Sequence, residues 1–261
     1  MGIPPPFGIN QSPKIPIASH ATGSFKVIEL LSFSFSFRGP REDNQDKLLG
    51  PLKTGTGAWL VGIADGVGGS PGGGEAAELA VDTVRDAFRV VPFDELIATA
   101  AAAIARRAEE DAQLRKMATT LSLVRIDGKQ ATVAHVGDTR IYHLRGHGLN
   151  SLTEDQTEVA ELRKKRVLSE YQLKNYPRKN VLTSVLSPRM DYNVYYAKAD
   201  VLPGDRLVLL TDGTYSVVPK KVIADLSVAN SDPQAFLEAL RTKTEASDPR
   251  DNYSAIVLEC R

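Results

Sequence analysis

The stretch Ala-Trp-Leu-Val-Gly-Ile-Ala-Asp-Gly-Val-Gly-Gly, residues 58–69, decides the fold. Its first seven residues form an apolar run without a charge, which predicts a strand buried on both faces. Asp65 and Gly66 end the run, and a glycine-rich turn then leads into a helix expected over residues 75–89. The sequence therefore places a carboxylate at the end of a buried strand.

On both sides of this stretch, apolar periodicity predicts further strands and helices. Upstream, Phe33, Phe35 and Phe37 alternate with serines, which is the period of a strand with one buried face. Downstream, Asp127-Gly128 between two period-two segments is a strong hairpin signal. The other expected elements are a helix over 93–116, strands over 120–126, 130–136 and 140–145 that form a meander, a strand over 206–211, helical stretches near 220 and 233, and a final strand over 253–259.

The order of these elements predicts an α+β domain. The strands cluster on either side of paired helices and do not alternate with them one by one, which favours stacked α and β layers over a doubly wound sheet. Residues 1–24 contain five prolines and are expected to form a flexible tail, so the domain is expected over 25–261. Residues 153–191 are polar and contain two prolines, and we expect them to form an inserted flap.

Composition and charge exclude several classes of function. The 261 residues carry 32 Lys and Arg against 32 Asp and Glu, so no net positive field attracts nucleic acid or an anionic membrane. Cys260 is the only cysteine, which excludes a disulfide framework and a thiolate zinc cluster. No uncharged run is long enough to span a bilayer, and the N-terminus lacks the pattern of an export signal. We therefore expect a soluble, cytoplasmic protein that contacts neither membrane nor nucleic acid.

Four acidic residues occupy similar positions at the ends of predicted strands. Asp65 and Asp212 end buried strands, Asp46 begins a short apolar run, and Asp251 immediately precedes the last strand. Taken singly, Asp-Gly after a strand is usually a simple turn, because Asp caps the backbone and Gly accepts positive φ. Four such positions together indicate a metal site instead. Carboxylates without Cys or His are ligands for Mg²⁺ or Mn²⁺, and two ions that share a carboxylate suit the hydrolysis of phosphoryl esters.

The electrostatic cost of gathering these carboxylates supports the same hypothesis. Two carboxylates about 4 Å apart repel each other by roughly 4 kcal/mol at an effective dielectric constant near 20. Bound cations remove that repulsion, and they lower the pKa of a bridging water so that it supplies hydroxide near neutral pH. A nucleophilic side chain is then not required.

Two other motifs match by letter but fail on physical grounds. Residues 68–72 fit the G-x-S-x-G nucleophile elbow, but the residue after the serine must donate its backbone N–H, and Pro71 has none. Residues 72–77 fit a relaxed dinucleotide fingerprint, yet that motif must begin directly at the strand end. The histidines show no metal-ligand spacing, and His135, inside a predicted strand, is expected to be structural.

The chain contains seven short motifs in a fixed order. They are Arg41-Glu42-Asp43-Asn44-Gln45-Asp46, Asp65-Gly66-Val67-Gly68-Gly69, Met117-Ala118-Thr119-Thr120-Leu121, His135-Val136-Gly137-Asp138-Thr139-Arg140, Leu152-Thr153-Glu154-Asp155, Thr211-Asp212-Gly213 and Asp251-Asn252. Each motif alone is weak, but their order and spacing are specific. From about residue 25 to the C-terminus, the chain resembles the metal-dependent protein serine/threonine phosphatases of type 2C, the PPM family, in their compact bacterial form.

This resemblance implies a four-layer α-β-β-α sandwich with a binuclear Mn²⁺ or Mg²⁺ centre at one end of the two central sheets. It implies that Asp65 bridges the two ions, that Asp46 acts largely through metal-bound water, and that Arg41 grips the substrate phosphate. The other ligands that it implies are Asp212 and Asp251 on one ion, the backbone carbonyl of Gly66, and Asp138 together with Asp212 on a weaker third ion.

The resemblance also implies a direct reaction. The hydroxide that bridges the ions attacks phosphorus in line, and no phosphoenzyme forms. Eukaryotic members have a histidine after the Asp-Gly pair that is regarded as the general acid. Val67 occupies that position here, as in bacterial members that also lack the histidine, so another group must supply the proton. The chain also departs from the family's usual residues at Gln45, Ala118, Thr139 and Gln156, which leaves the acidic set intact.

The leading hypothesis is a protein serine/threonine phosphatase that acts on phosphoserine and phosphothreonine proteins and opposes a bacterial Ser/Thr protein kinase. We expect it to be a monomer. Two alternatives remain open. Val67 and Gln45 suggest a phosphatase-like module that binds phosphoproteins without turnover, and the same ligand set could serve a metal-dependent small-molecule phosphatase or phosphodiesterase.

Overall fold

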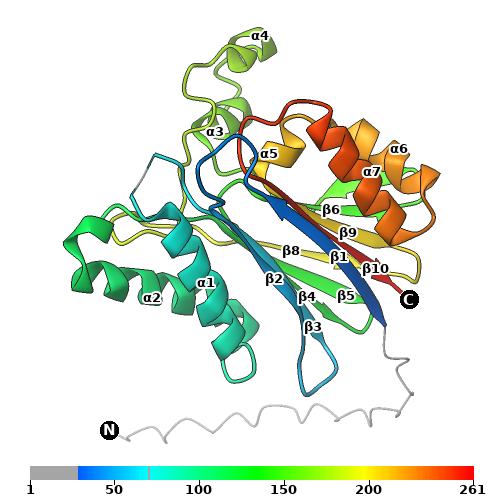
Figure 1. Cartoon of the computed structure of the whole chain (residues 1–261), viewed down its shortest axis with the longest axis horizontal. Helices are drawn as coiled ribbons and strands as arrows, with labels where there is room; N and C mark the ends of the chain where they lie inside the picture. Colours follow the sequence, from blue (N-terminus) through cyan, green and yellow to red (C-terminus); the bar gives the residue numbers. More distant parts are fainter. Residues whose placement is uncertain (1–28, 70) are drawn as a thin grey trace, which may run out of the picture.

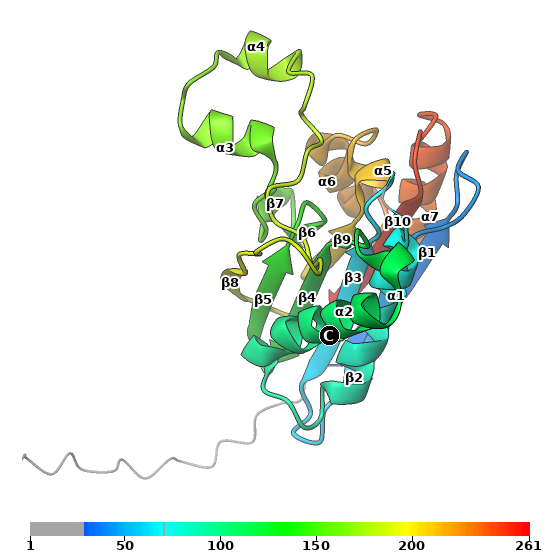
Figure 2. The same ribbon diagram turned by 90° about the vertical axis from the view of Figure 1, so that its left-hand side faces the viewer.

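Two antiparallel β-sheets pack face to face between two layers of helices in the computed structural model, which describes residues 29–69 and 71–261 (Figures 1 and 2). The elements are β1 Leu30–Phe37, β2 Asp46–Lys53, β3 Trp59–Asp65, α1 Gly73–Ala87, α2 Leu96–Glu110, β4 Leu121–Asp127, β5 Gln130–Val136, β6 Arg140–Arg145, β7 Gly148–Ser151, α3 Glu158–Lys164, α4 Glu170–Lys174, β8 Tyr195–Asp200, β9 Arg206–Leu210, α5 Asp212–Tyr215, α6 Lys220–Ala229, α7 Pro233–Glu245 and β10 Tyr253–Cys260. The tail expected over residues 1–24 lies outside the described residues.

The layers follow the predicted α-β-β-α order. One sheet has the strand order β1-β10-β9-β6-β7, and α6 and α7 cover its outer face. The other sheet has the order β2-β3-β4-β5-β8, and α1 and α2 cover it from the opposite side. The four-layer sandwich predicted from the sequence is therefore confirmed. None of the helices in the described part of the chain combines the length and apolarity that a membrane span requires.

The run that opens the prediction, residues 58–64, is confirmed as a buried strand. Alternate side chains of β3 enter two different cores, because successive residues of a strand point to opposite faces. Val61 and Ile63 pack against the facing sheet, whereas Leu60 and Ala64 pack beneath α1 and α2. Each fully buried Val, Leu or Ile contributes about 1.5–3 kcal/mol. A strand covered on both faces therefore needs an uninterrupted apolar sequence.

The helix predicted over residues 93–116 is wrong in extent. Residues Phe93–Glu95 form a 3-10 turn, and α2 ends at Glu110. Asp111 then has an extended backbone with φ −133° and ψ 110°, and its carboxylate accepts a hydrogen bond from the backbone N–H of Gln113. This aspartate caps a second 3-10 turn and so ends the α-helix.

The predicted meander is also wrong, because its third strand belongs to the other sheet. The hairpin of β4 and β5 around Gly128 is confirmed, but β6 pairs with β9 and β7 and not with β5. The chain changes sheets at Gly137, whose φ is 111° and whose added Cβ would lie 2.5 Å from Cγ2 of Thr120. Period-two alternation fixes the two faces of a strand but leaves its partner open. The sequence analysis did not predict β7 and β8, which have no fully buried residue.

The segment between β7 and β8 carries α3 and α4, which stand clear of the sandwich in Figures 1 and 2. Ser169 and Gln172 form a capping box at the start of α4. The hydroxyl of Ser169 accepts a hydrogen bond from the backbone N–H of Gln172, and the side-chain oxygen of Gln172 accepts one from the backbone N–H of Ser169. This segment therefore has local helical structure of its own outside the two-sheet core.

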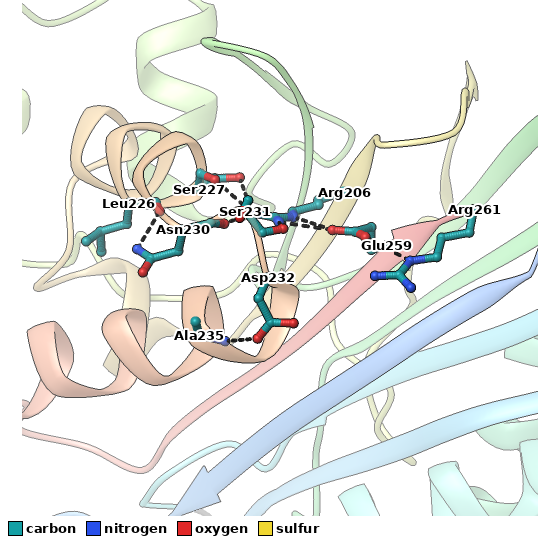
Figure 3. Close-up of polar contacts among 9 residues, drawn as sticks. All are labelled: Arg206, Leu226, Ser227, Asn230, Ser231, Asp232, Ala235, Glu259 and Arg261. Carbon is teal, nitrogen blue, oxygen red and sulfur yellow. Dashed lines mark hydrogen bonds and ion pairs between the residues drawn. The ribbon is translucent and has the colours of Figure 1, made fainter.

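A buried ion pair lies at the end of β9 remote from Asp212 (Figure 3). The side chains of Arg206 and Glu259 are 7% and 10% exposed, and their charged groups lie 3.0 Å apart. The guanidinium also donates hydrogen bonds to the backbone carbonyls of Ser227, in the last turn of α6, and of Asn230 and Ser231, which follow that helix. Arg206 thus ties the connection between α6 and α7 to the end of β9, the central strand of its sheet.

Replacing Glu259 with alanine should destabilise the protein by about 3 kcal/mol, because the change leaves the buried guanidinium without its counter-charge. Glu238→Ala is the matched control, since Glu238 pairs with Arg241 on the exposed face of α7 and should cost less than about 1 kcal/mol. Urea unfolding of the two variants measures the difference. Equal losses in the two variants would contradict a stabilising role for the buried pair.

His135 on β5 is confirmed as a structural histidine. Its Nε2 donates to the backbone carbonyl of Glu154 at 3.0 Å, so its Nδ1 must accept from the hydroxyl of Ser122 at 2.7 Å. Ser122 in turn accepts from the hydroxyl of Thr139 at 2.6 Å. The ring is buried, and removal from water lowers the pKa of His135 from 6.5 to about 4.

This buried imidazole predicts a specific loss of stability in acid. Between pH 4 and pH 6.5 the unfolded chain binds more protons at His135 than the folded chain, so the free energy of unfolding falls as the pH drops through that window. His135→Gln keeps hydrogen-bonding capacity but cannot titrate. The stability advantage of the wild type over this variant should shrink by about 2 kcal/mol from pH 7 to pH 5. Urea unfolding at both pH values tests this, and parallel pH profiles of the two proteins would refute it.

Candidate active site

Strand pairing brings the predicted acidic residues to one end of the sandwich. Asp46, the first residue of β2, lies directly opposite Asp65, the last residue of β3. Residues opposite each other in an antiparallel pair have Cβ atoms about 4.5–5.5 Å apart. In the facing sheet, Asp212 follows β9 and Asp251 precedes β10, and these two strands are paired. Four positions that are remote in sequence thus come together at adjacent strand ends.

A cavity of about 630 Å³ opens at this end of the sheets. Six of the seven predicted site residues line it, namely Arg41, Asp65, Gly66, Asp138, Asp212 and Asp251. The seventh, Asp46, is only 3% exposed and is buried close to the acidic group. Asp138 reaches the cavity from the loop between β5 and β6, where the chain crosses from one sheet to the other.

Asp46 is held by hydroxyls from the facing sheet. Its Oδ2 accepts hydrogen bonds from Thr211 at 2.8 Å and from Ser254 at 2.7 Å. Its Oδ1 is buried and has no hydrogen-bond partner among the described residues. The pKa of Asp46 is raised to about 7, mainly by burial and also by the nearby charges of Asp212 and Asp251, against the two hydroxyls, which lower it. A buried carboxylate oxygen without a partner is costly unless a cation or a proton satisfies it.

The other carboxylates of the cavity share this electrostatic strain. Burial, followed by repulsion from Asp46 and Asp212, raises the pKa of Asp65 well above its usual value. Burial and repulsion from Asp251 raise the pKa of Asp212 to about 6. Burial and repulsion from Asp212 raise the pKa of Asp138 to about 7. The site therefore concentrates more negative charge than its protein surroundings neutralise.

Two glycines allow the backbone to approach closely around the carboxylates. A Cβ on Gly66 would lie 2.5 Å from the backbone of Gly73 at the start of α1, so only glycine fits directly after Asp65. A Cβ on Gly213 would lie 2.1 Å from the carbonyl oxygen of Asn252. This second contact packs the residue after Asp212 against the residue after Asp251. The Asp-Gly pairs therefore serve close packing as well as turn formation.

Arg41 and Asp251 form an ion pair at the mouth of the cavity. Nη2 of Arg41 lies 2.6 Å from Oδ2 of Asp251, and the two side chains are 50% and 37% exposed. Asn252 holds the loop that carries Arg41, because its side-chain amide donates to the carbonyls of Arg38 and Asp43 and its Oδ1 accepts from the N–H of Gln45. The arginine is thus presented beside the acidic group and remains open to solvent.

A second arginine supports the cavity without entering that ion pair. Arg140 binds both oxygens of Asp155 at 2.8 and 2.6 Å, and its guanidinium lies 3.7 Å from the ring centre of Tyr215. The hydroxyl of Tyr215 donates to Oδ2 of Asp138 at 3.1 Å. This chain of contacts fixes the carboxylate of Asp138.

The residues present fit a site for hard divalent cations. No group of three or more His, Cys, Asp and Glu side chains in residues 29–69 and 71–261 is drawn together as a closed cluster of ligands. Hydroxyls hold Asp46, Tyr215 holds Asp138, and Arg41 holds Asp251. The donor set nevertheless consists of carboxylate oxygens, which such cations prefer, and the unpartnered Oδ1 of Asp46 needs a positive partner.

Sequence reasoning missed the residues that support the site. Asn252 was noted only as the neighbour of Asp251, although it fastens the loop of Arg41. Asn180 and Leu182 line the cavity from the segment that carries α3 and α4, and Tyr215 binds Asp138. These residues give no sequence signal for such contacts, because the contacts depend on how separate segments of the chain fold against one another.

Comparison with known proteins places this geometry in a family. The chain matches the model of the protein phosphatase 2C family over residues 40–254. It is 29% identical over 211 residues to the serine/threonine phosphatase stp of Listeria monocytogenes, an alignment that covers 77% of this chain and 84% of that protein. Its fold matches the serine/threonine phosphatase Stp1 of Staphylococcus aureus with a TM-score of 0.81 and 21% identity, over 88% of this chain and 95% of that one.

A further solved structure with the same fold is the catalytic domain of the serine/threonine protein phosphatase PstP in complex with two manganese ions. Its TM-score is 0.75 at 23% identity, over 89% of this chain and 98% of that one. The family match spans every residue that the sequence singled out for the site, from Arg41 to Asp251. The resemblance inferred from the ordered motifs is confirmed, and the chain belongs to the protein phosphatase 2C family.

Proposed function

We propose that this protein hydrolyses phosphoserine and phosphothreonine esters in proteins at the cavity between the two sheet ends, with two divalent cations as cofactors. The observation that carries the proposal is the gathering of Asp46, Asp65 and Asp212 beside a cavity that also presents Arg41. Carboxylates suit divalent cations, and a guanidinium fork suits a phosphate. The family match and the phosphatase relatives support the same activity.

The acidic residues divide the binding of the cations between them. Asp65 is central, because Asp46, Asp138, Asp212 and Asp251 all act on its carboxyl, and it would hold both ions. Asp46, Asp212, Asp251 and the carbonyl of Gly66 would complete the pair, and Asp138 with Asp212 would hold a weaker third ion. When bound, the cations supply an activated water for attack on phosphorus and neutralise charge on the phosphoryl oxygens. The PstP complex with two manganese ions supports Mn²⁺ as the ion to test first, with Mg²⁺ second.

Arg41 would bind and orient the phosphoryl group. Its planar fork can donate two parallel hydrogen bonds to phosphate oxygens, which fixes the direction from which phosphorus is approached. In the structure one of these donors is engaged by Asp251 at 2.6 Å. The phosphate therefore competes with Asp251 for Arg41, and a half-exposed ion pair of this kind is weak enough to yield.

The leaving oxygen of serine or threonine would take its proton from water. Val67 lines the cavity at the position where eukaryotic relatives have a histidine. Within the described residues, no histidine lines the cavity, since His135 and His143 are buried in hydrogen bonds elsewhere. An imidazole proton donor is therefore not part of the proposed reaction.

The proposed biological setting follows from the proposed substrate. A Ser/Thr protein kinase that modifies the same proteins would be the opposing enzyme. We propose that the protein acts in the cytoplasm as a monomer. The single cysteine, Cys260, is buried, and burial raises its pKa to about 11, which keeps the thiol inert.

Wild-type protein should hydrolyse both p-nitrophenyl phosphate and phosphothreonine peptides at roughly millimolar Mn²⁺. Asp212→Asn should lower kcat about 100-fold or more, because even groups outside the ligand shell of a metal site cost 10–100-fold. Asp127→Asn is the control, since Asp127 is exposed at the end of β4 that leads into the hairpin turn and should retain full activity. Phosphate release by the wild type and the two variants tests this prediction.

The same assay separates the alternative functions. Binding of phosphopeptide without turnover at any divalent ion would identify a binding module. Faster turnover of sugar phosphates or cyclic nucleotides than of phosphopeptides would identify a small-molecule enzyme. Either result would overturn the proposed activity.

Divalent cations should also stabilise the fold, which can be measured without any substrate. At a Mn²⁺ concentration about 100 times the dissociation constant, the expected gain is about 2.7 kcal/mol. Asp65→Asn should lose most of the accompanying rise in Tm, whereas Asp127→Asn should keep it. Binding should release protons near pH 7, because the pKa values of Asp46 and Asp138 are about 7. An equal rise in Tm for wild type and Asp65→Asn would place the cations elsewhere.

A further inference from the structure

A groove extends from the catalytic cavity along the segment that carries α3 and α4. It encloses about 780 Å³ and shares Arg41, Asp138, Asn180, Asp212 and Asp251 with the cavity, so the two spaces are continuous. One wall comes from α3, α4 and the loop that follows them, and the other from α5 and the loop between α7 and β10. In Figures 1 and 2 these two walls lie on either side of the same end of the sheets.

The outer part of this groove carries cations that lack strong partners. Lys179 lies on the wall after α4, and Arg250 lies on the wall before β10. Both are exposed, and neither makes an ion pair or side-chain hydrogen bond with any of the described residues. Arg163 on α3 adds a third charge, which is held only loosely by Glu170 at 3.4 Å.

The acidic residues that line the outer part of the groove do not neutralise all of its positive charge. Asp155 lines the groove but is already bound through both oxygens by Arg140. Glu170 already pairs with Arg163, and Asp248, which is exposed and makes no ion pair within the described residues, offsets one of the two remaining cations. Asp138 and Asp212 lie at the inner end, where the cavity begins. The outer groove therefore keeps an excess of positive charge facing the path to the active site.

We propose that Lys179 and Arg250 select substrates that carry acidic residues next to the phosphorylated serine or threonine. The inference rests on the proposed phosphatase activity and adds a substrate preference to it. A phosphoresidue in the cavity leaves the neighbouring peptide in the groove, because the two are continuous. Side chains two or three residues away from it reach roughly 7–10 Å along an extended peptide, into the part lined by these cations.

The expected preference is modest and sensitive to salt. Charge pairs at an exposed surface contribute a factor of about two to five each, and added salt screens them over about 10 Å. Two cations should therefore favour a Glu-flanked phosphothreonine peptide over a Lys-flanked one by about five- to twentyfold in kcat/KM at low salt. The difference should lie mainly in KM, because the groove contacts parts of the peptide that do not react.

The test compares matched peptides on matched variants. Three phosphothreonine peptides of equal length carry Glu, Gln or Lys at the flanking positions on both sides. They are assayed with Mn²⁺ on the wild type, on Lys179→Glu/Arg250→Glu, and on Lys129→Glu. Lys129 is exposed in the turn between β4 and β5, outside the groove, so this variant matches the charge change per residue. Turnover of p-nitrophenyl phosphate, which has no flanking residues, reports whether the cavity itself is intact.

The proposal expects the double variant to lose or invert the preference for Glu while its turnover of p-nitrophenyl phosphate stays unchanged. Lys129→Glu should behave as the wild type. Equal kcat/KM for Glu-flanked and Lys-flanked peptides in the wild type, or an unchanged preference in the double variant, would overturn the proposal. Failure of the wild type to turn over any substrate would overturn the phosphatase activity instead. Fluorescence anisotropy with the same peptides would then show whether the groove still selects acidic flanks, and equal binding of Glu and Lys peptides would overturn the selectivity as well.

Discussion

The structure depends on one electrostatic constraint, which is to keep several carboxylates at one end of the sheets, where burial leaves them poorly screened by water. Burial and mutual repulsion raise the pKa values of Asp46 and Asp138 to about 7 and that of Asp212 to about 6. Two charged carboxylates about 4 Å apart would repel each other by roughly 4 kcal/mol at an effective dielectric constant near 20. A fold that keeps such a group together must fix each carboxylate through backbone structure, because the side chains left to themselves would move apart.

Strand pairing and hydrogen bonds between the sheets meet this demand. The register of β2 and β3 sets Asp46 opposite Asp65, and this pair of strands belongs to the five-stranded sheet β2-β3-β4-β5-β8. Asp46 belongs to one sheet, but the hydroxyls that bind it, those of Thr211 and Ser254, come from the other. The acidic site therefore joins the two sheets at the same place where its charges repel. Cations that remove the repulsion would strengthen this junction.

The sequence predicted the parts of the site that repeat a strong local pattern. Asp65 follows a run whose seven residues must be buried on both faces, so its place at a strand end was readable from periodicity. The crossing of β6 into the other sheet was not, because it depends on Gly137 and its close approach to Thr120. The break after α2 depends on one capping contact of Asp111, and helical propensity alone favoured continuing. Contacts such as Tyr215 with Asp138 join separate elements and leave no pattern in either one.

The cationic groove and the acidic cavity act on an acidic peptide in opposite directions. The groove attracts the acidic residues that flank the phosphorylated residue, whereas the carboxylates that the reaction needs repel them. In the structure the positive and the negative charges lie in different parts of this space. Arg140 neutralises Asp155 in the groove, and Asp138 and Asp212 lie at the inner end, which the groove shares with the cavity. Divalent cations in the cavity would cancel much of the inner charge, so the flank would meet a positive groove only when the site is loaded. Selection of an acidic peptide would then depend on the same cations that support the reaction, which links substrate preference to a competent site.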